Sequence, residues 1–303
     1  MCTYGVYKLT VHSELRLPEL EEVDASPDVL FRFGPVDFHP AELQEEQFCA
    51  YGTTQDIRLY YPEIGKFHVR SGCEVVIDPL PGVIDCSLRL ILLGSALGIL
   101  LLQRGLMVFH SSVIKFPSGA AAFLAPKGYG KSTLAAALNI HGYDLVADDI
   151  MALDVAGETL LARPGFPQIK LWPDAANAIV ESPDPLPKLH PDYEKLTLRS
   201  PEKFSRHCVR LLSVFVFDIH EQIEIVPLDV KHTWLQVIPH WYGAQFDGKL
   251  LQAFGLKNHF AQCATLVQRV PVYVIRLPRS LKDLREVALA IERHMENPKK
   301  VPA

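Results

Sequence analysis

The alternation of apolar and polar residues near the N-terminus predicts a set of short strands. They are expected at residues 7–15, 57–61, 67–69 and 74–77. A turn at residues 70–72 separates the last two, and the Pro-Leu-Pro-Gly run at residues 79–82 then breaks the pattern. We therefore expect a small β-rich N-terminal domain over residues 1–85.

After residue 85 the pattern changes to longer helical stretches and apolar strands. An uncharged run at residues 90–102 lies within an expected helix over residues 86–103. A bilayer span needs about 20 apolar residues, so this shorter run predicts a buried helix and no membrane association. Further helices are expected at residues 132–140, 258–270 and 281–295.

Strands interleave with these helices and predict an α/β (α+β) fold with a mixed central sheet over residues 86–303. They are expected at residues 107–109, 112–116, 120–124, 144–147, 151–155, 159–162, 211–217, 224–228 and 271–277. The proline-rich, charged stretch at residues 182–210 is expected to be a long loop with a short helix.

Composition narrows the class of protein. The chain has 303 residues, of which 49% are hydrophobic and 21% charged, as in ordinary soluble globular proteins. A net charge of −5 and scattered lysines and arginines argue against a nucleic-acid partner. The six cysteines form no CxxC pair, and the N-terminus lacks the pattern of a secretory signal. These features predict a cytoplasmic protein without a thiolate metal site.

The main candidate for chemistry is the segment at residues 125–133, which matches the phosphate-loop pattern GxxxxGK[ST] except for Ala125 in place of the first glycine. Gly128 and Gly130 let successive backbone N–H groups point at one phosphate. An apolar strand precedes the loop and a helix follows it, whose N-terminus favours anions. The residues expected to bind the nucleotide are Lys127, Gly128, Tyr129, Gly130, Lys131, Ser132 and Thr133. The alternative is a glycine-rich strand–helix turn that happens to contain a lysine.

Two side chains of this loop have expected roles. Lys131 supplies positive charge to the β- and γ-phosphates of ATP, and the Ser132 hydroxyl is placed to bind Mg²⁺. Asp148 and Asp149 follow an apolar strand 17 residues after Lys131. One carboxylate is expected to hold Mg²⁺ and the other to accept a proton from an attacking hydroxyl. We assign Asp148 as the base and Asp149 as the metal-side partner, although the sequence does not order them, and a solvated turn is the alternative.

His110 lies at a strand end 21 residues before Lys131. An isolated histidine at such a position is usually structural, but here the following hairpin is expected to bring it to the loop. It is then expected to hydrogen-bond a phosphate oxygen or to orient Asp148. Arg163, Lys170 and Arg206 are weaker candidates for binding a phosphate or a peptide carboxylate, with ordinary surface charges as the alternative.

The combination of His110, the loop and the LVADD run at residues 145–149 resembles the C-terminal domain of HPr kinase/phosphorylase, over residues 105–175. Both spacings agree with that family. The resemblance implies a P-loop kinase domain of HPr-kinase type that uses ATP and Mg²⁺ to phosphorylate a serine hydroxyl. Residues 162–172 lack that family's RGxGI-like run and its metal-binding glutamate, so phosphorylase activity is not expected.

Two softer motifs are similar to the HPr-kinase-like kinases of lasso-peptide gene clusters: SELRLPEL at residues 13–20 and PGFPQIKLW at residues 164–172. This resemblance implies phosphorylation of a serine, typically the C-terminal one, of a ribosomal precursor peptide. An HPr-like protein kinase, a small-metabolite or phosphoenolpyruvate-carboxykinase-like enzyme, and a non-catalytic nucleotide-binding regulator remain alternatives. Leader binding, substrate presentation and homo-oligomerisation are open roles for the N-terminal domain.

Overall fold

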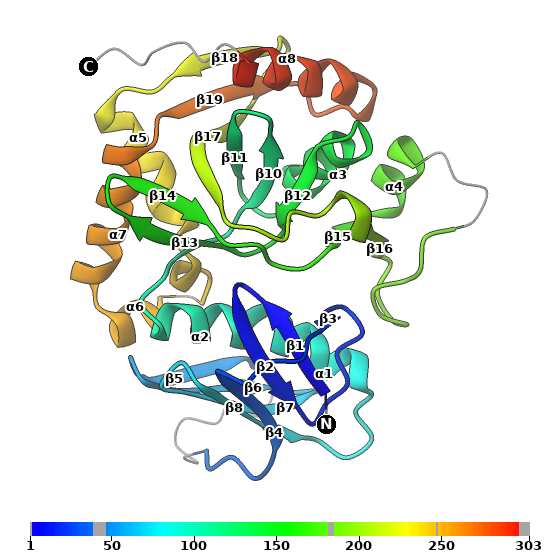
Figure 1. The fold of residues 1–303 in the computed structure, drawn as a ribbon, viewed down its shortest axis with the longest axis vertical. Helices are drawn as coiled ribbons and strands as arrows, with labels where there is room; N and C mark the ends of the chain where they lie inside the picture. The colour runs from blue at the N-terminus through cyan, green and yellow to red at the C-terminus, as the bar shows by residue number, and fades with distance from the viewer. Residues whose placement is uncertain (1, 39–46, 181–184, 247, 297–303) are drawn as a thin grey trace. The chain divides into compact units, whose positions relative to one another are not determined.

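The computed structural model describes residues 2–38, 47–180, 185–246 and 248–296. The chain forms two compact units (Figure 1). Unit 1 comprises Met1–Val108 and Tyr242–His259, and unit 2 comprises Phe109–Trp241 and Phe260–Ala303. Each unit is built from strands and helices, so the expected mixed α/β character is confirmed.

Unit 1 is built on one sheet with the strand order β3-β1-β2-β4-β8-β7-β6-β5. The strands are β1 (Cys2–Val6), β2 (Leu9–Ser13), β3 (Glu21–Glu22), β4 (Val29–Phe33), β5 (Cys49–Thr53), β6 (Asp56–Tyr61), β7 (Gly65–Arg70) and β8 (Glu74–Pro79). The strands predicted around β6, β7 and β8 are confirmed. The predicted strand at residues 7–15 is shorter because Tyr7 and Lys8 adopt positive φ in the β1–β2 turn. Strands β1, β3, β4 and β5 were not predicted.

A continuous helical run covers Asp85–Gln103 in unit 1. It consists of α1 (Asp85–Ile91), a π-helical turn (Leu92–Ala96) and α2 (Leu97–Gln103), and it packs on β7. The run is long and apolar enough to cross a membrane by length and composition, and 56% of its most apolar window is buried. The sequence analysis placed this helix in the second domain, whereas its contacts place it in unit 1.

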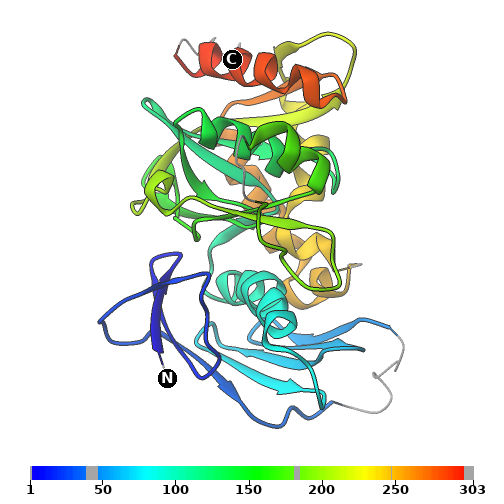
Figure 2. The same cartoon turned by 90° about the vertical axis from the view of Figure 1, so that its right-hand side faces the viewer.

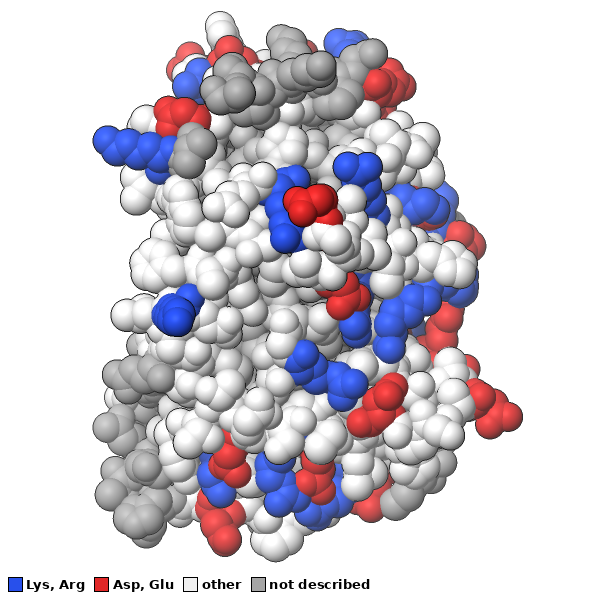
Figure 3. Space-filling view, turned by 60° about the vertical axis from the view of Figure 1, so that its left-hand side comes forward, with Lys and Arg blue, Asp and Glu red and all other residues white. Residues whose placement is uncertain are grey.

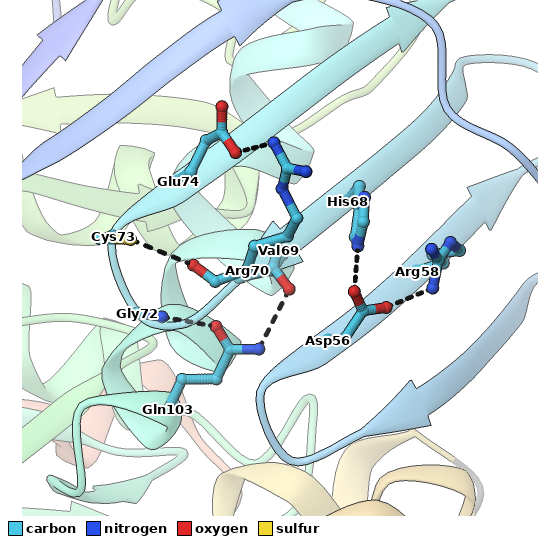
Figure 4. A network of polar contacts seen from close by, with 9 residues as sticks. All are labelled: Asp56, Arg58, His68, Val69, Arg70, Gly72, Cys73, Glu74 and Gln103. Carbon is cyan, nitrogen blue, oxygen red and sulfur yellow. Dashed lines mark hydrogen bonds and ion pairs between the residues drawn. The ribbon is translucent and has the colours of Figure 1, made fainter.

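One buried side chain ties that helix to the sheet. The Gln103 amide donates to the Val69 carbonyl at 3.0 Å and accepts from the Gly72 N–H at 2.9 Å, which joins the end of α2 to the β7–β8 turn (Figure 4). The later segment Tyr242–His259 also belongs to unit 1, where α6 (Lys249–Phe254) contacts β5. A boundary at residue 85 therefore does not describe how the chain is divided.

Unit 2 has a mixed sheet whose strands run in the order β12-β10-β11-β17-β14-β13. Strands β11, β17 and β19 are parallel, and β18 pairs antiparallel with β19. The strands are β10 (Ser112–Phe116), β11 (Gly119–Leu124), β12 (Asp144–Ala147), β13 (Met151–Ala156), β14 (Thr159–Ala162), β17 (Val209–Ile219), β18 (Glu224–Pro227) and β19 (Val272–Leu277). Together with β9 (Met107–Phe109), these agree with the predicted strands.

The helices of unit 2 are α3 (Lys131–Ile140), α4 (Pro173–Ile179), α5 (Val230–Val237) and α8 (Leu284–Glu296). Helix α7 (Leu256–Arg269) matches the helix predicted at residues 258–270. Helices α3 and α8 pack side by side (Figure 2) and enclose an apolar core that includes Phe123, Phe215 and Ile291. Helices α4 and α5 were not predicted.

The stretch predicted as a long loop at residues 182–210 contains a strand instead. Residues 181–184 lie outside the described residues, and β16 (Leu196–Arg199) pairs antiparallel with β15 (Gln168–Leu171) to form a two-stranded ribbon. The short helix expected there is a single 3-10 turn at Pro201–Lys203. Leu196 and Leu198 turn one face of the ribbon into the core, which is why this charged segment forms a strand.

Surface charge is mixed on the face drawn in Figure 3. Lysine and arginine side chains are interspersed with aspartate and glutamate over the described residues of that face. The absence of a nucleic-acid partner and the cytoplasmic location stay predictions.

Candidate active site

The glycine-rich loop connects β11 to α3 in unit 2, as the sequence predicts. Gly128 and Gly130 have φ of 87° and 92°, in the left-handed region where an L side chain would be strained. Gly130 is also the N-cap residue of α3, so the free N–H groups of the first helical turn open onto the loop. Ala125 is fully buried and is not among the residues with positive φ, so no glycine is required at the first position.

Lys131 is the first residue of α3, and its side chain turns back over the loop. Its ammonium nitrogen donates to the Ala125 carbonyl at 2.6 Å and to the Pro126 carbonyl at 3.4 Å. The residue is only 7% exposed, and this burial lowers the pKa of Lys131 from its usual value. A buried cation held by backbone carbonyls of a glycine-rich loop, beside the free N–H groups of the α3 N-terminus, is suited to binding a polyphosphate.

Asp148 follows β12 and receives several hydrogen bonds. Its Oδ1 accepts from the Ser112 hydroxyl at 2.6 Å and from the Ser132 hydroxyl at 3.0 Å. Its Oδ2 accepts from the Lys170 backbone N–H at 3.4 Å. Burial, followed by the neighbouring negative charge of Asp149, raises the pKa of Asp148 to about 6. This carboxylate can therefore accept a proton near neutral pH, which is the property of a general base.

Asp149 is held in a different way. Its φ of 67° is unusual for a residue other than glycine, and its carboxylate forms an ion pair with Lys170 at 2.7 Å. Burial alone would raise the pKa of Asp149, but the positive charge of Lys170 lowers it well below its usual range. The two neighbouring carboxylates thus differ: one binds hydroxyl groups and the other is neutralised by a lysine.

His110 contacts the turn that carries the two aspartates. Its Nδ1 lies 3.0 Å from the Asp149 carbonyl oxygen, which only accepts hydrogen bonds, so Nδ1 carries the proton and Nε2 is left with a free lone pair. Burial, followed by the positive charge of Lys131, lowers the pKa of His110 to about 4, so the ring is neutral at physiological pH. His110 therefore orients the Asp148–Asp149 turn through its backbone.

The PGFPQIKLW stretch supports both aspartates. The Gly165 N–H donates to the Val146 carbonyl at 2.8 Å, just before Asp148, and the stretch then continues into β15, which carries Lys170. Lys170 contacts Asp148 through its backbone and Asp149 through its side chain. The stretch at residues 164–172 thus has a physical role, because it positions the Asp148–Asp149 pair.

The β15–β16 ribbon presents a second set of side chains beside Lys170. Lys170 is opposite Thr197, and Leu171 is opposite Leu196, which places Trp172 beside Lys195. Residues two apart on a strand share a face, so Lys170 and Trp172 lie on the same side of the ribbon. The Lys195 ammonium lies 5.3 Å from the centre of the Trp172 ring, and that tryptophan is 47% exposed.

The other predicted residues are placed as follows. Lys127 and Tyr129 are exposed at the tip of the loop, and Thr133 is half-buried in the first turn of α3. Arg163 forms a two-bond pair with Asp154 at 2.6 and 2.9 Å, at the start of the β13–β14 hairpin rather than at the aspartate pair. Arg206 is exposed and lies two residues after Phe204. Phe204 forms a β-bridge with Leu145, at the opposite end of β12 from Asp148. Lys170 is the weaker candidate whose contacts with both aspartates the structure shows.

Sequence reasoning missed three residues that surround the site: Ser112, Lys195 and His240. Ser112 begins β10 two residues after His110, and β10 pairs with β12 of the LVADD run, so its position at a strand start was a usable signal. The His240 carbonyl accepts from the His110 backbone N–H at 2.8 Å. Burial, followed by the charge of Lys131, lowers the pKa of His240 to about 4. Nothing local in the sequence links His240 to the loop.

The oxygen atoms at this site fit a magnesium ion. The Ser132 hydroxyl and the Asp148 carboxylate lie 3.0 Å apart, and both are hard oxygen ligands of the kind Mg²⁺ prefers. Among the described residues, no group of three His, Cys, Asp or Glu side chains forms a metal site. Such a pair suits an ion that takes its remaining ligands from phosphates and water. Asp149 was the expected metal-side partner of Ser132, although the sequence does not order the two aspartates, and the structure joins Ser132 to Asp148.

Comparisons with known proteins give limited information. No protein-family model matches the chain, and no curated protein matches it. Among solved structures, the chain is similar to the HPr(Ser) kinase/phosphatase from Coxiella burnetii, with a TM-score of 0.35 and 11% sequence identity. The match covers 62% of this chain and 97% of that chain. A likeness at this level does not assign a family.

Proposed function

We propose that this protein is an ATP- and Mg²⁺-dependent serine kinase whose acceptor is a ribosomally made precursor peptide, with the C-terminal serine as the phosphorylated residue. The observation that carries the proposal is the meeting of three groups: the glycine loop with Lys131, the Ser132 hydroxyl, and a buried Asp148 with a raised pKa. The choice of a peptide acceptor rests on the resemblance of residues 13–20 and 164–172 to kinases of lasso-peptide clusters.

The proposed reaction follows from the positions of these groups. The loop N–H groups and Lys131 bind the triphosphate, and Asp148 accepts the proton of the serine hydroxyl as its oxygen attacks the γ-phosphorus. The bond from the γ-phosphorus to the bridging oxygen breaks, and ADP leaves. Ser132 and the aspartates would hold Mg²⁺, which would neutralise charge on the phosphates. His110 and Lys170 hold the aspartate turn in place.

The ribbon supports an acceptor site beside Asp149. Trp172 offers an exposed ring, and Lys195 stands over it without a carboxylate partner among the described residues. Lys195 also lies near enough for its positive charge to help lower the pKa of Asp149. A peptide that packs against the ring and places its C-terminal carboxylate on Lys195 would bring its last residue toward the acidic pair.

The test uses labelled ATP with synthetic peptides that end in serine with a free carboxylate. We expect label on the peptide, located by mass spectrometry at the terminal serine. Peptides that end in alanine should stay unlabelled, and C-terminal amidation should raise KM. Lys131→Met should abolish transfer, because the triphosphate loses its buried cation. ATP affinity is measured in parallel by calorimetry, so that binding and transfer are read separately.

The alternatives give different results in the same assay. Label on a small metabolite, with none on peptide or protein, would replace the peptide acceptor by a metabolite. Label on an HPr-like protein, with none on peptides, would favour a protein kinase. ATP binding without transfer to any acceptor would indicate a nucleotide-binding regulator. Failure of the wild-type chain to bind ATP would overturn the proposal entirely.

A further inference from the structure

An aromatic–cation pair lies at the tip of the loop. Tyr129 is 39% exposed, and the guanidinium carbon of Arg279 lies 5.9 Å from the centre of its ring. Arg279 is itself exposed, and within the described parts of the chain it forms no ion pair. Its neighbour Arg276, by contrast, is paired with Asp218 and Glu224. An exposed arginine over an exposed ring is therefore the main interaction of both side chains.

The topology of the sheet explains why Arg279 reaches the loop. Strands β11, β17 and β19 are parallel neighbours, so their C-terminal ends meet at one edge, where ligands of open α/β sheets bind. The last residue of β11, Leu124, is level with Val216, which is level with Val274. Strand β19 continues to Leu277, so the segment that follows it extends beside the glycine loop.

On the basis of the proposed function, we propose that Tyr129 and Arg279 form the subsite for the base of the nucleotide. A base is a flat aromatic ring that stacks on tyrosine rings and on guanidinium planes. Stacked planes lie roughly 3.5 Å apart, so a base between the two side chains needs a separation of roughly 7 Å. The observed distance of 5.9 Å is slightly shorter than this, so the two side chains must move apart to admit a base. Arg279 is a long, exposed side chain that can move by that amount.

This arrangement divides nucleotide recognition between two sets of groups. The backbone of the loop and Lys131 contact phosphates, which every nucleoside triphosphate and inorganic tripolyphosphate share. Tyr129 and Arg279 contact the base, which tripolyphosphate lacks. The two ligands therefore separate the base subsite from the phosphate site in one binding experiment.

The test measures the Kd of Mg²⁺-ATP and of Mg²⁺-tripolyphosphate by calorimetry. We expect Tyr129→Ala and Arg279→Ala each to weaken ATP about 10-fold and to change tripolyphosphate by less than about twofold. Tyr129→Phe should keep the affinity for ATP, because the ring is retained. Arg285→Ala is the matched control for loss of charge, because Arg285 is exposed on α8 beside His141, at the far end of α3 from the loop.

Each other outcome has a clear meaning. Equal weakening of both ligands would show that the pair acts through charge or loop shape, and unchanged ATP affinity in both alanine variants would show that the base lies elsewhere. Either result overturns the subsite and leaves the kinase proposal standing. If the wild-type chain binds neither ligand, the proposed function fails, and the base subsite fails with it.

Discussion

Each of the two units contains a carboxylate that accepts several hydrogen bonds, but the donors differ between the units. In unit 1, Glu74 accepts bonds from Arg32 at 2.7 Å and from Arg70, on neighbouring strands of the sheet (Figure 4 shows the Arg70 pair). Burial alone would raise the pKa of Glu74, but the two arginines hold it below its usual value. In unit 2, Asp148 accepts from two serine hydroxyls, and its pKa is raised to about 6.

The two carboxylates show how the surrounding donors set the pKa of an acid. A carboxylate paired with arginines stays ionised and binds a proton only at low pH, because the positive charges lower its pKa. A buried carboxylate that meets only neutral donors, and that lies beside another carboxylate, takes up a proton more easily.

The largest difference between the two carboxylates is expected when each is replaced by its amide. Asp148→Asn keeps the size of the side chain but removes proton acceptance, so we expect kcat to fall by about 10³-fold. Glu74→Gln should leave kcat unchanged and lower the free energy of unfolding by about 0.5–1 kcal/mol, because its partners are partly exposed. Near-normal peptide phosphorylation by the Asp148 variant would remove it as the base.

Removing the lysine that pairs with Asp149 is expected to lower activity by a smaller factor. Lys170→Met leaves the Asp149 carboxylate buried without its partner, and we expect activity to fall by about 10- to 100-fold. The dependence of the rate on Mg²⁺ should change as well, because a freed carboxylate competes for the ion. Lys115→Met is the matched control, since Lys115 pairs with Asp144 at the other end of β12. Equal effects of the two variants would mean that the Lys170 pair matters only for the fold.

The smallest expected effect is on the pH dependence of stability. Burial, followed by the charges of Lys131 and His110, lowers the pKa of His240 to about 4, against 6.5 for the ordinary side chain. The unfolded chain therefore binds more protons between these values, and stability falls as pH drops below about 6.5. Between pH 7 and pH 5, we expect His240 to account for a loss of roughly 1–2 kcal/mol.

A variant isolates this histidine from the other titrating groups. His240→Gln should flatten the curve of unfolding free energy against pH in that interval, as measured by urea titration at several pH values. His232→Gln provides the control, because His232 is exposed at the start of α5. A curve that stays as steep in the His240 variant would place the pH dependence in other groups.

Local patterns predicted much of this fold. The hairpins of unit 2, the glycine loop and the helix after it were found because turn residues and apolar alternation lie close together in sequence. The ribbon strand β16 was missed because only Leu196 and Leu198 carry its alternation, in a segment otherwise rich in charge and proline. The return of Tyr242–His259 to unit 1 was missed because no local pattern records which unit a segment packs against.

The candidate site was predictable to the extent that its residues belong to motifs. His110, Lys131, Ser132 and the aspartates were named from spacing, and the structure gathers them. The sequence did not predict which of these side chains contact one another. Ser132 contacts Asp148, and Lys170 contacts Asp149. Arg279 approaches the loop only through the order of parallel strands, which no spacing reveals.

The backbone of the loop has a consequence for finding other proteins of this kind. The glycines that the structure requires are Gly128 and Gly130, whose φ values of 87° and 92° exclude most side chains. The first position of the pattern is a buried alanine without positive φ. Searches that insist on glycine at that position would pass over such chains. A pattern that fixes glycine at the positions of Gly128 and Gly130, and allows any small residue at the position of Ala125, would recover them.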